Sequence, residues 1–294
     1  MYSCPLCESK SSTKLYAEAE YDENNLDAYA FASRKTPEYQ HHELIECKEC
    51  QFLFCVNIPS QEMLHLLYKD AAFDSKSEAQ NASVTYMKYL KKKSKTPINR
   101  NMALDIGTGE GSFLEILLSE EWKDVAGVEP SKSPIELADE KVKPLIINNI
   151  FKTDDFENDS YDLVSIFQTI EHIPNPLAVA TGIRELLISS GIVYIVCHNY
   201  LSPVNKLLGK KSPIFDIEHL QLFSKKSIRV LLTKAGFTDI KIFTLVNSYP
   251  LYYWVKLFPL SANIKKSVLR FLDITGFGRI KVGINVGNIG VIAK

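Results

Sequence analysis

The sequence has no apolar run that approaches the ~20 residues a helix needs to cross a bilayer. Its N-terminus, MYSCPLCESK, lacks the apolar core of a secretory signal. Neither sign of charge is in excess, since 34 Lys and Arg oppose 35 Asp and Glu, and strong non-specific nucleic-acid binding requires a basic surface. These absences predict a cytoplasmic protein that does not bind nucleic acid through charge alone.

Internal repeats and low-complexity tracts are also absent from the 294 residues. With 46% hydrophobic residues, the chain can bury a sizeable core. Its length favours one large domain or two modest ones.

Cysteine, in contrast, occurs in two C-x-x-C pairs, Cys4–Cys7 and Cys47–Cys50. In a cytosolic chain such pairs indicate a metal before they indicate disulfides. Each pair can aim two thiolates at one tetrahedral ion, so the two pairs predict a closed, structural zinc shell. Its ligands would be Cys4, Cys7, Cys47 and Cys50. A redox pair or unconnected buried thiols are the alternatives, and His41 or His42 could replace one ligand.

The most informative stretch is ALDIGTGEGSFLEILL, residues 103–118. A short apolar run ends in Asp105 and an apolar pattern at helical spacing follows, which predicts a strand, a turn and a helix. Three glycines form the turn: Gly107, Gly109 and Gly111. Glycine suits this turn because it tolerates backbone angles that a Cβ penalises and lets a ligand approach the bare main chain. A dinucleotide site would need its third glycine where this chain has Ser112.

A second carboxylate ends the next predicted strand, Val125–Glu129. An acid roughly 20 positions past a glycine turn can accept both hydroxyls of a ribose. The alternative is that Glu129 is a solvated helix-capping carboxylate, and the spacing alone would also suit NAD.

From residue 102 onward, predicted strands alternate with predicted helices, which indicates an α/β, Rossmann-like, mostly parallel sheet. Seven strands are predicted near residues 102–106, 124–129, 144–148, 161–167, 191–198, 238–246 and 286–293. Helices are predicted near residues 111–121, 132–141, 175–188 and 224–235. Ahead of the sheet, residues 60–93 predict two helical pieces separated by a polar stretch.

The fourth strand leads into a polar loop within YDLVSIFQTIEHIPNP, residues 161–176. Ligands of open α/β sheets bind at the carboxyl ends of the strands, so we expect this loop to face a ligand. It presents Gln168, Glu171 and His172, and Pro176 opens the next helix.

The pattern D-x-G-x-G-x-G at Asp105–Gly111 resembles motif I of the class I S-adenosylmethionine (SAM)-dependent methyltransferases. The loop at 171–176 is similar to the E-H-x-x-x-P phrase of small-molecule members, such as ubiquinone-pathway O-methyltransferases and sugar-modifying relatives. The Asn/Asp-Pro-Pro-aromatic tetrad of nucleic-acid amino-methyltransferases is missing there. The resemblance covers residues 102–294 and implies the seven-stranded class I methyltransferase sheet, preceded here by a small zinc-binding module.

The resemblance also implies SAM contacts. The positions concerned are Asp105, Gly107, Gly109, Gly111, Glu129, Asn149, Ile150 and Gln168. The glycines would take the methionine end of SAM, with Asp105 orienting its amino group and Glu129 holding the ribose. The asparagine–isoleucine pair would flank the adenine, and Gln168 would border the methionine or the acceptor.

A base helps when the methyl acceptor is a hydroxyl or an acidic carbon, and histidine near its ordinary pKa suits this task. His172 and His219 are the candidate catalytic residues, with His198 behind them. The alternative for His172 is a structural role, in which its side chain only hydrogen-bonds to the loop.

Residues 249–280 are aromatic and apolar at first, and basic residues then intersperse an amphipathic stretch. A lid over the acceptor pocket, a helix packed against the core and a membrane-surface helix are three interpretations, and the last would suit a lipid-linked acceptor. The chain is expected to divide into a zinc-binding module (1–58), a helical connector (59–100) and a SAM-dependent methyltransferase domain (101–294).

The favoured hypothesis is a SAM-dependent methyltransferase that acts on a small molecule, namely a sugar, a sugar nucleotide or a glycan unit. A cysteine module ahead of a SAM domain resembles sugar C-methyltransferases, which run on into a further domain. Because this chain ends at Lys294, O-methylation is expected at least as strongly. An RNA methyltransferase with a zinc module and a non-catalytic SAM-fold binding protein are the alternatives.

Overall fold

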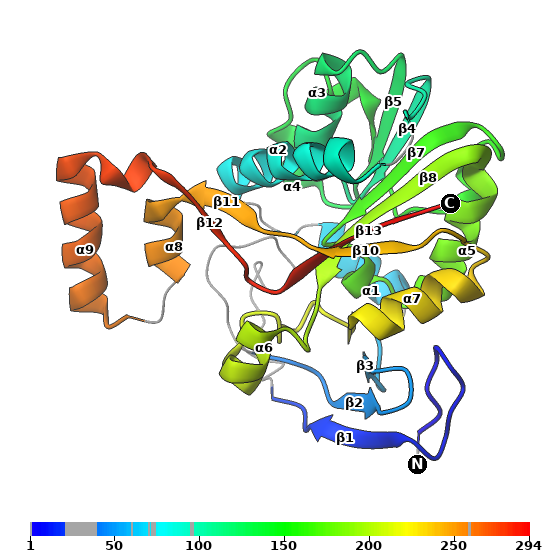
Figure 1. The fold of residues 1–294 in the computed structure, drawn as a ribbon, viewed down its shortest axis with the longest axis horizontal. Coiled ribbons are helices and arrows are strands. Elements are labelled where there is room, and N and C mark those ends of the chain that lie inside the picture. Colours follow the sequence, from blue (N-terminus) through cyan, green and yellow to red (C-terminus); the bar gives the residue numbers. More distant parts are fainter. Residues whose placement is uncertain are drawn as a thin grey trace.

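A seven-stranded sheet forms the centre of the computed structural model, which describes residues 2–20, 40–59, 61–69, 71, 75–94, 97–257 and 260–294 (Figure 1). The strand order is β10-β13-β8-β7-β4-β5-β6. The strands are β4 (Met102–Ile106), β5 (Asp124–Val128), β6 (Ile146–Ile147), β7 (Tyr161–Phe167), β8 (Leu187–His198), β10 (Lys241–Thr244) and β13 (Asn288–Ala293). Only β13 runs antiparallel to its neighbours in this sheet, so the predicted mostly parallel sheet is confirmed.

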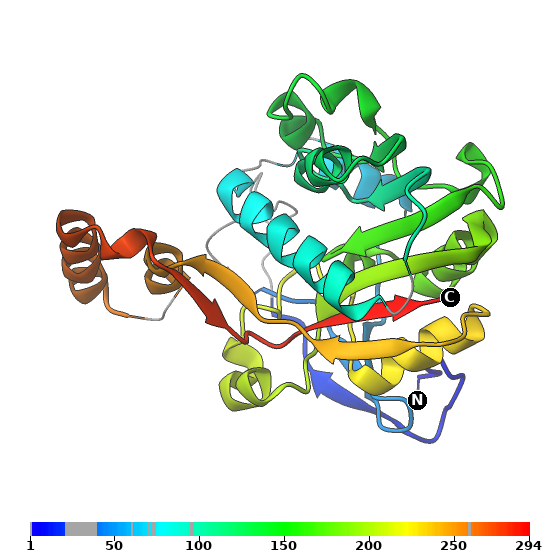
Figure 2. The same cartoon turned by 45° about the horizontal axis from the view of Figure 1, so that its top comes forward.

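Helices cover both faces of this sheet (Figure 2). They include α2 (Lys76–Lys93), α3 (Ser112–Ser119), α4 (Lys132–Glu136), α5 (Pro176–Leu186) and α7 (Lys225–Lys234). Helix α1 (Gln61–Lys69) packs elsewhere, with its Leu64 against Ile217 and Leu220. The helix predicted near 132–141 is shorter than expected. It ends at Glu136, and the Asp139 carboxylate then accepts the Lys141 N–H at 3.0 Å, a local bond that competes with helix.

Alternate residues of the central strands enter two different cores, as the period of two in a strand requires. Leu104 and Ile106 of β4 pack in the core beneath α5 and α7. Ala103 of the same strand packs in the core beneath α2 and α3. The strands are therefore buried on both faces, which explains their nearly continuous apolar sequences.

The N-terminal strands form a second, four-stranded sheet of order β1-β2-β3-β9. Its strands are β1 (Thr13–Ala17), β2 (Leu44–Cys47), β3 (Phe52–Cys55) and β9 (Gln221–Leu222). Strand β9 comes from a distant part of the chain. The hydrophobic core also continues from the N-terminal sheet into this part, because the ring centroid of Phe52 lies 5.2 Å from that of Phe223. The described residues among 2–58 are thus joined to the later part of the chain by strand pairing and by packing.

A third unit projects from the body on the left of Figure 1. It consists of the hairpin β11 (Asn247–Pro250) and β12 (Lys281–Ile284) with α8 (Leu251–Leu257) and α9 (Ala262–Thr275). The Trp254 indole N–H donates to the Val282 carbonyl at 2.8 Å and fastens α8 to the hairpin. Helix α6 (Pro203–Leu208) leaves the body below this unit. Among the described residues, no helix has both the length and the apolar character needed to span a membrane.

Candidate active site

A cavity of about 1460 Å³ lies at the carboxyl ends of β4, β5 and β7. This volume exceeds the ~300–1,000 Å³ that is usual for one ligand site. Side chains from the sheet, from α1 and α2, and from the projecting unit all line it. The cavity therefore has room for a cofactor and a second ligand side by side.

The predicted glycine turn borders this cavity and takes the backbone shape that glycine permits. Gly107 has φ +73°, and a Cβ placed there would lie 2.2 Å from Oγ1 of Thr169, so no other residue fits without rearrangement. Gly109 has φ +59° and donates its N–H to Oε2 of Glu129 at 3.0 Å. Gly107 is among the residues that line the cavity, whereas Gly109 and Gly111 shape the turn behind it.

The carboxylate of Glu129 is buried and lines the cavity. Its second oxygen accepts the N–H of Ser131 at 2.8 Å, so one side chain holds both the glycine turn and the start of α4. Burial raises the pKa of Glu129, and the two backbone N–H donors oppose this effect. Glu129 is therefore not a solvated capping residue.

Asp105 lies at the end of β4 and is also buried against the cavity. Its carboxylate accepts the hydroxyl of Ser165 at 2.6 Å. The pKa of Asp105 is raised to about 7, mainly by burial and to a smaller extent by the nearby carboxyls of Glu110 and Glu129, while hydrogen bonds from Ser165 and Thr108 oppose the rise. A cationic ligand group at this position would favour the ionised form of Asp105.

Gln168 carries two signs of a ligand contact. It has φ +50°, a left-handed conformation that is unfavourable for a side chain other than glycine. Its side-chain Oε1 is buried and has no hydrogen-bond partner among the described residues, yet Gln168 lines the cavity. Such a buried acceptor is unfavourable unless a ligand or water satisfies it.

The predicted adenine-binding pair is placed less directly. Ile150 lines the cavity, and Asn149 lies just outside its lining with its Oδ1 accepting the Ile150 N–H at 2.9 Å. The neighbouring Asn148 donates from Nδ2 to the carbonyl of Glu129 at 2.9 Å and so ties the ends of β5 and β6 together.

Three histidines meet in the same cavity. The ring centroid of His219 lies 4.8 Å from that of His172 and 5.3 Å from that of His198. Nδ1 of His172 lies 3.0 Å from the backbone carbonyl oxygen of Glu218, and Nδ1 of His219 lies 2.9 Å from that of Ile214. Nδ1 of His198 lies 2.8 Å from the side-chain carbonyl oxygen Oδ1 of Asn288. A carbonyl can only accept, so Nδ1 carries the proton and Nε2 carries the lone pair in each neutral ring.

Burial lowers the pKa of His172 and of His198 to about 4, so both are neutral at physiological pH. Neutral imidazoles can accept a proton from a ligand, but a pKa of about 4 makes these two rings weaker bases than the histidine near its ordinary pKa that the sequence predicted. Ligand atoms of His172, Glu218 and His219 also lie within 4.8 Å of one another, a spacing that a divalent cation can bridge. The structure thus brings both predicted catalytic histidines together in the same cavity as the glycine turn.

Several lining residues were not predicted from the sequence as site residues. Tyr68 on α1 lines the cavity, with its hydroxyl 3.2 Å from Nδ1 of His172, although its apolar spacing indicated only helix packing. Asn247 and Asn288 line it from β11 and β13. Glu171, which the sequence predicted to face a ligand together with Gln168 and His172, does not line the cavity; it is completely buried, and its Oε1 accepts the His198 N–H at 2.6 Å, so it supports the loop from behind.

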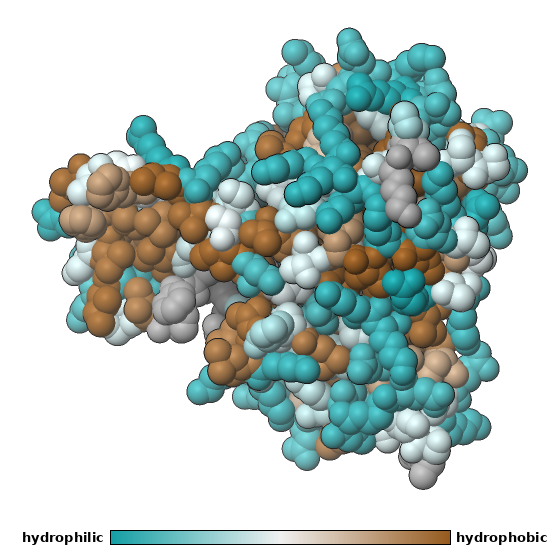
Figure 3. All heavy atoms as spheres, viewed as in Figure 1, coloured by the Kyte–Doolittle hydropathy of each residue, from teal (hydrophilic) through white to brown (hydrophobic). Residues whose placement is uncertain are grey.

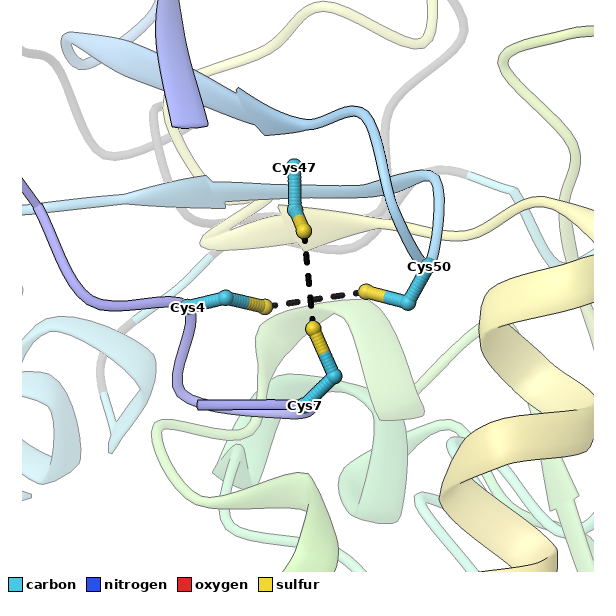
Figure 4. Close-up of side chains that lie close together, drawn as sticks. All are labelled: Cys4, Cys7, Cys47 and Cys50. Carbon is cyan, nitrogen blue, oxygen red and sulfur yellow. Dashed lines mark hydrogen bonds between the residues drawn. The ribbon is translucent and has the colours of Figure 1, made fainter. Parts of the chain in front are cut away.

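The four cysteines of the two C-x-x-C pairs converge at a separate point near the N-terminus (Figure 4). Their sulfur atoms lie within 4.8 Å of one another, with Cys4 3.6 Å from Cys50 and Cys7 3.5 Å from Cys47. His41 and His42 are buried but do not belong to this group. The structure therefore brings the two C-x-x-C motifs together, as the sequence predicted.

Comparison with known proteins identifies the class. Residues 79–242, more than half of the chain, match the family model of a methyltransferase domain. The chain therefore belongs to this methyltransferase family and is a class I SAM-dependent methyltransferase, as the glycine turn and the sheet predicted. Family membership favours an enzyme over the non-catalytic alternative.

Two individual proteins are similar to parts of the chain. A ubiquinone biosynthesis O-methyltransferase of Vibrio campbellii is 30% identical over 120 residues, which are 39% of this chain and 47% of that protein. The match thus spans about half the length of the relative. A SAM-dependent methyltransferase of Archaeoglobus fulgidus superposes with a TM-score of 0.50 at 19% identity, over 75% of this chain and 96% of the other. The second similarity shows the fold.

We predict that S-adenosylhomocysteine, which carries the same ammonium group as SAM, binds more weakly as the pH falls below about 7. The resemblance implies that Asp105 orients the ammonium group. Its pKa is raised to about 7 in the free protein, so in that role the carboxyl would have to lose a proton on binding below this pH. The dissociation constant should rise by up to about tenfold per pH unit. Calorimetric titration in buffers of different ionisation enthalpy should also show proton release.

Asp105→Asn is the matched control, because it keeps the shape but cannot titrate, and its pH dependence should be weaker. An affinity of the wild-type protein that is constant from about pH 6 to about pH 8 would contradict the prediction.

Proposed function

We propose that this methyltransferase transfers the methyl group of SAM to a hydroxyl group, or to an acidic carbon, of a sugar, a sugar nucleotide or a glycan unit. The observation that carries the proposal is the group of three adjacent histidine rings in the cavity that also contains the glycine turn. Asn247 adds support, because its buried Oδ1 lines the cavity without a partner among the described residues. An acceptor hydroxyl would satisfy this oxygen.

The residues that we propose for SAM binding are Asp105, Gly107, Gly109, Gly111, Glu129, Asn149, Ile150 and Gln168. The buried carboxylates and the unsatisfied amide oxygen fit a ligand with an ammonium group and two ribose hydroxyls. Bound SAM supplies an electrophilic methyl group on a sulfonium ion. The residues around it mainly fix its position, and positioning can supply much of the rate in such a transfer.

We propose His172 and His219 as the catalytic bases. As the acceptor oxygen bonds to the methyl group, its proton would pass to Nε2 of one of these rings, whose Nδ1 atoms are held by the carbonyls of Glu218 and Ile214. The tautomer with its proton on Nδ1 supports this role, because it leaves the lone pair on Nε2. The ring of His198 would then line the cavity beside that of His219.

We also propose that Cys4, Cys7, Cys47 and Cys50 bind a structural zinc ion. A tetrahedral shell with Zn–S bonds of about 2.3 Å places its sulfur atoms about 3.8 Å apart. The S–S distances of 3.5 Å and 3.6 Å support this assignment. Four protein ligands leave no position for a substrate, and thiolate ligands suit a reducing compartment such as the cytoplasm.

The proposed division of the chain is a zinc-binding module at 1–58, a helical connector at 59–100 and a SAM-dependent methyltransferase domain at 101–294. Residues 249–280 would form a lid over the acceptor, since Tyr253 and Trp254 line the cavity.

Glu129→Ala should weaken the binding of S-adenosylhomocysteine by about tenfold or more, because it removes the acceptor for Gly109 and Ser131 as well as the proposed ribose contact. Titration calorimetry measures the change. Glu136→Ala removes an exposed carboxylate on α4 and should leave the affinity unchanged. Equal affinities of Glu129→Ala and the wild type for S-adenosylhomocysteine would contradict the proposed role of Glu129.

His172→Ala and His219→Ala should each lower kcat by about 10²-fold to 10⁴-fold, the usual contribution of a general base. Mass spectrometry of a panel of nucleotide sugars and glycans, with RNA as a comparison, would first identify the acceptor. Both variants should bind S-adenosylhomocysteine normally, which separates loss of a base from loss of the cofactor site. Methylation of RNA alone, or unchanged kcat in both variants, would contradict the proposal.

Purified protein should contain one zinc ion per chain by native mass spectrometry. Cys47→Ala should lose it and unfold at lower denaturant concentration, since structural zinc contributes directly to folding. Cys55→Ala provides the control, because Cys55 is a buried thiol outside the four-cysteine group and its variant should keep the metal. Zinc retained by Cys47→Ala would exclude the four-cysteine shell.

A further inference from the structure

The outer surface of the projecting unit is unusually apolar for a position so far from the core. Figure 3 shows hydrophobic side chains gathered over α9 and the turn that follows it. Five large apolar side chains there are at least 54% exposed. They are Ile264, Phe271, Ile274, Phe277 and Ile280, and together they are named the distal patch. Contiguous exposed apolar surface of this kind marks an interaction site.

The segment that carries the distal patch is also rich in basic residues. The segment 251–284 contains six Lys or Arg and one Asp, a net charge of +5. The whole chain has a net charge of −1, so the remainder carries −6. The basic residues are Lys256, Lys265, Lys266, Arg270, Arg279 and Lys281. The segment that carries the distal patch therefore has a net positive charge, whereas the rest of the chain has a net negative charge.

The same unit reaches the cavity. Tyr253 and Trp254 of α8 line it, as does Ile284 at the end of β12. Leu207 of α6 is 86% exposed and also lines the cavity, together with Lys210 and Lys211. Apolar side chains thus line the cavity from two separate segments, and each segment also carries basic residues.

We propose that the distal patch docks this methyltransferase on an anionic membrane surface, from which the cavity receives an acceptor with a lipid anchor. Ile264, Phe271 and Ile274 share one face of α9, as residues seven and three positions apart do on a helix. Such a face enters the region between headgroups and acyl chains, while flanking Lys and Arg contact anionic headgroups. The docking step stands by itself, and only the anchored acceptor rests on the proposed function.

The charge distribution favours a membrane over the other occupants of such a face. A two-fold pairing of two copies would bring the basic residues of one patch against those of the other, which is repulsive. A nucleic acid would satisfy the charges but would leave aliphatic side chains such as Ile264 and Ile274 without an apolar partner. A bilayer surface satisfies both.

The test is co-sedimentation of the full chain with vesicles of phosphatidylcholine alone and with equal parts of phosphatidylglycerol. We expect binding to the anionic vesicles, weakened by salt. The double variant Phe271→Ser/Ile274→Ser and the triple variant Lys265→Glu/Lys266→Glu/Arg270→Glu should each lower the partition coefficient by about tenfold or more. Every altered side chain except that of Lys265 is exposed, and Lys265 is only half-buried, so folding should be preserved.

Matched controls alter exposed residues elsewhere. Leu15→Ser/Val84→Ser removes two apolar side chains, and Lys225→Glu/Lys226→Glu reverses two charges on α7. Neither should change vesicle binding, and all variants should bind S-adenosylhomocysteine as the wild type does.

Three results would overturn membrane docking. The first is equal binding to both vesicle types, or binding to neither. The second is loss of binding in the charge variant but not in the apolar variant, and the third is a dimer in solution that dissociates in the apolar variant while the vesicles bind no protein. Failure of the proposed function is distinguishable, because a protein that binds vesicles but methylates only soluble acceptors would keep the docking surface and lose the anchored acceptor.

Discussion

The buried carboxylate of Glu129 is the interaction on which the cofactor side of this site depends. It accepts the N–H of Gly109 and that of Ser131, so it ties the turn after β4 to the start of the helix after β5. Hydrogen bonds to an ionised group contribute about 1.5–3 kcal/mol each, more than neutral ones. Burial raises the pKa of this carboxyl while the two donors lower it, so the turn and the charge stabilise each other. Removing either one would affect the whole carboxyl edge of the sheet.

The region around the histidines, where we propose that the acceptor binds, is built on a different principle, which is the exclusion of charge. His172 and His198 have pKa values lowered to about 4 by burial, and the buried Glu171 behind them has its pKa raised to about 7. All three groups therefore tend toward their neutral forms. Neutral imidazoles with fixed tautomers suit proton acceptance beside a sulfonium ion, since no positive charge is brought close to another before the reaction.

The sequence predicted the elements whose signals are local. The strands near 102–106 and 161–167, and the turn at Gly107, follow from short-range patterns of apolar residues and glycine. What it could not predict are contacts between distant segments. The pairing of β9 with β3 and the contact of Tyr68 with His172 join residues more than 100 positions apart, and no periodicity records such a pairing. The strand predicted at 144–148 is only two residues long, Ile146–Ile147, because only these residues pair with β5.

These distant contacts give the N-terminal sheet a consequence for the active site. The N–H of Cys55 in β3 donates to the carbonyl of Leu220 at 2.9 Å, and the N–H of Leu220 donates to the carbonyl of Glu171 at 3.0 Å. His219 precedes Leu220 directly, and His172 follows Glu171 directly. The strand that leaves the four-cysteine group thus fixes the spacing between the two histidine loops. If zinc holds that strand in place, losing the metal would disturb the pair of imidazoles from a distance, through main-chain hydrogen bonds and without any contact between metal and acceptor.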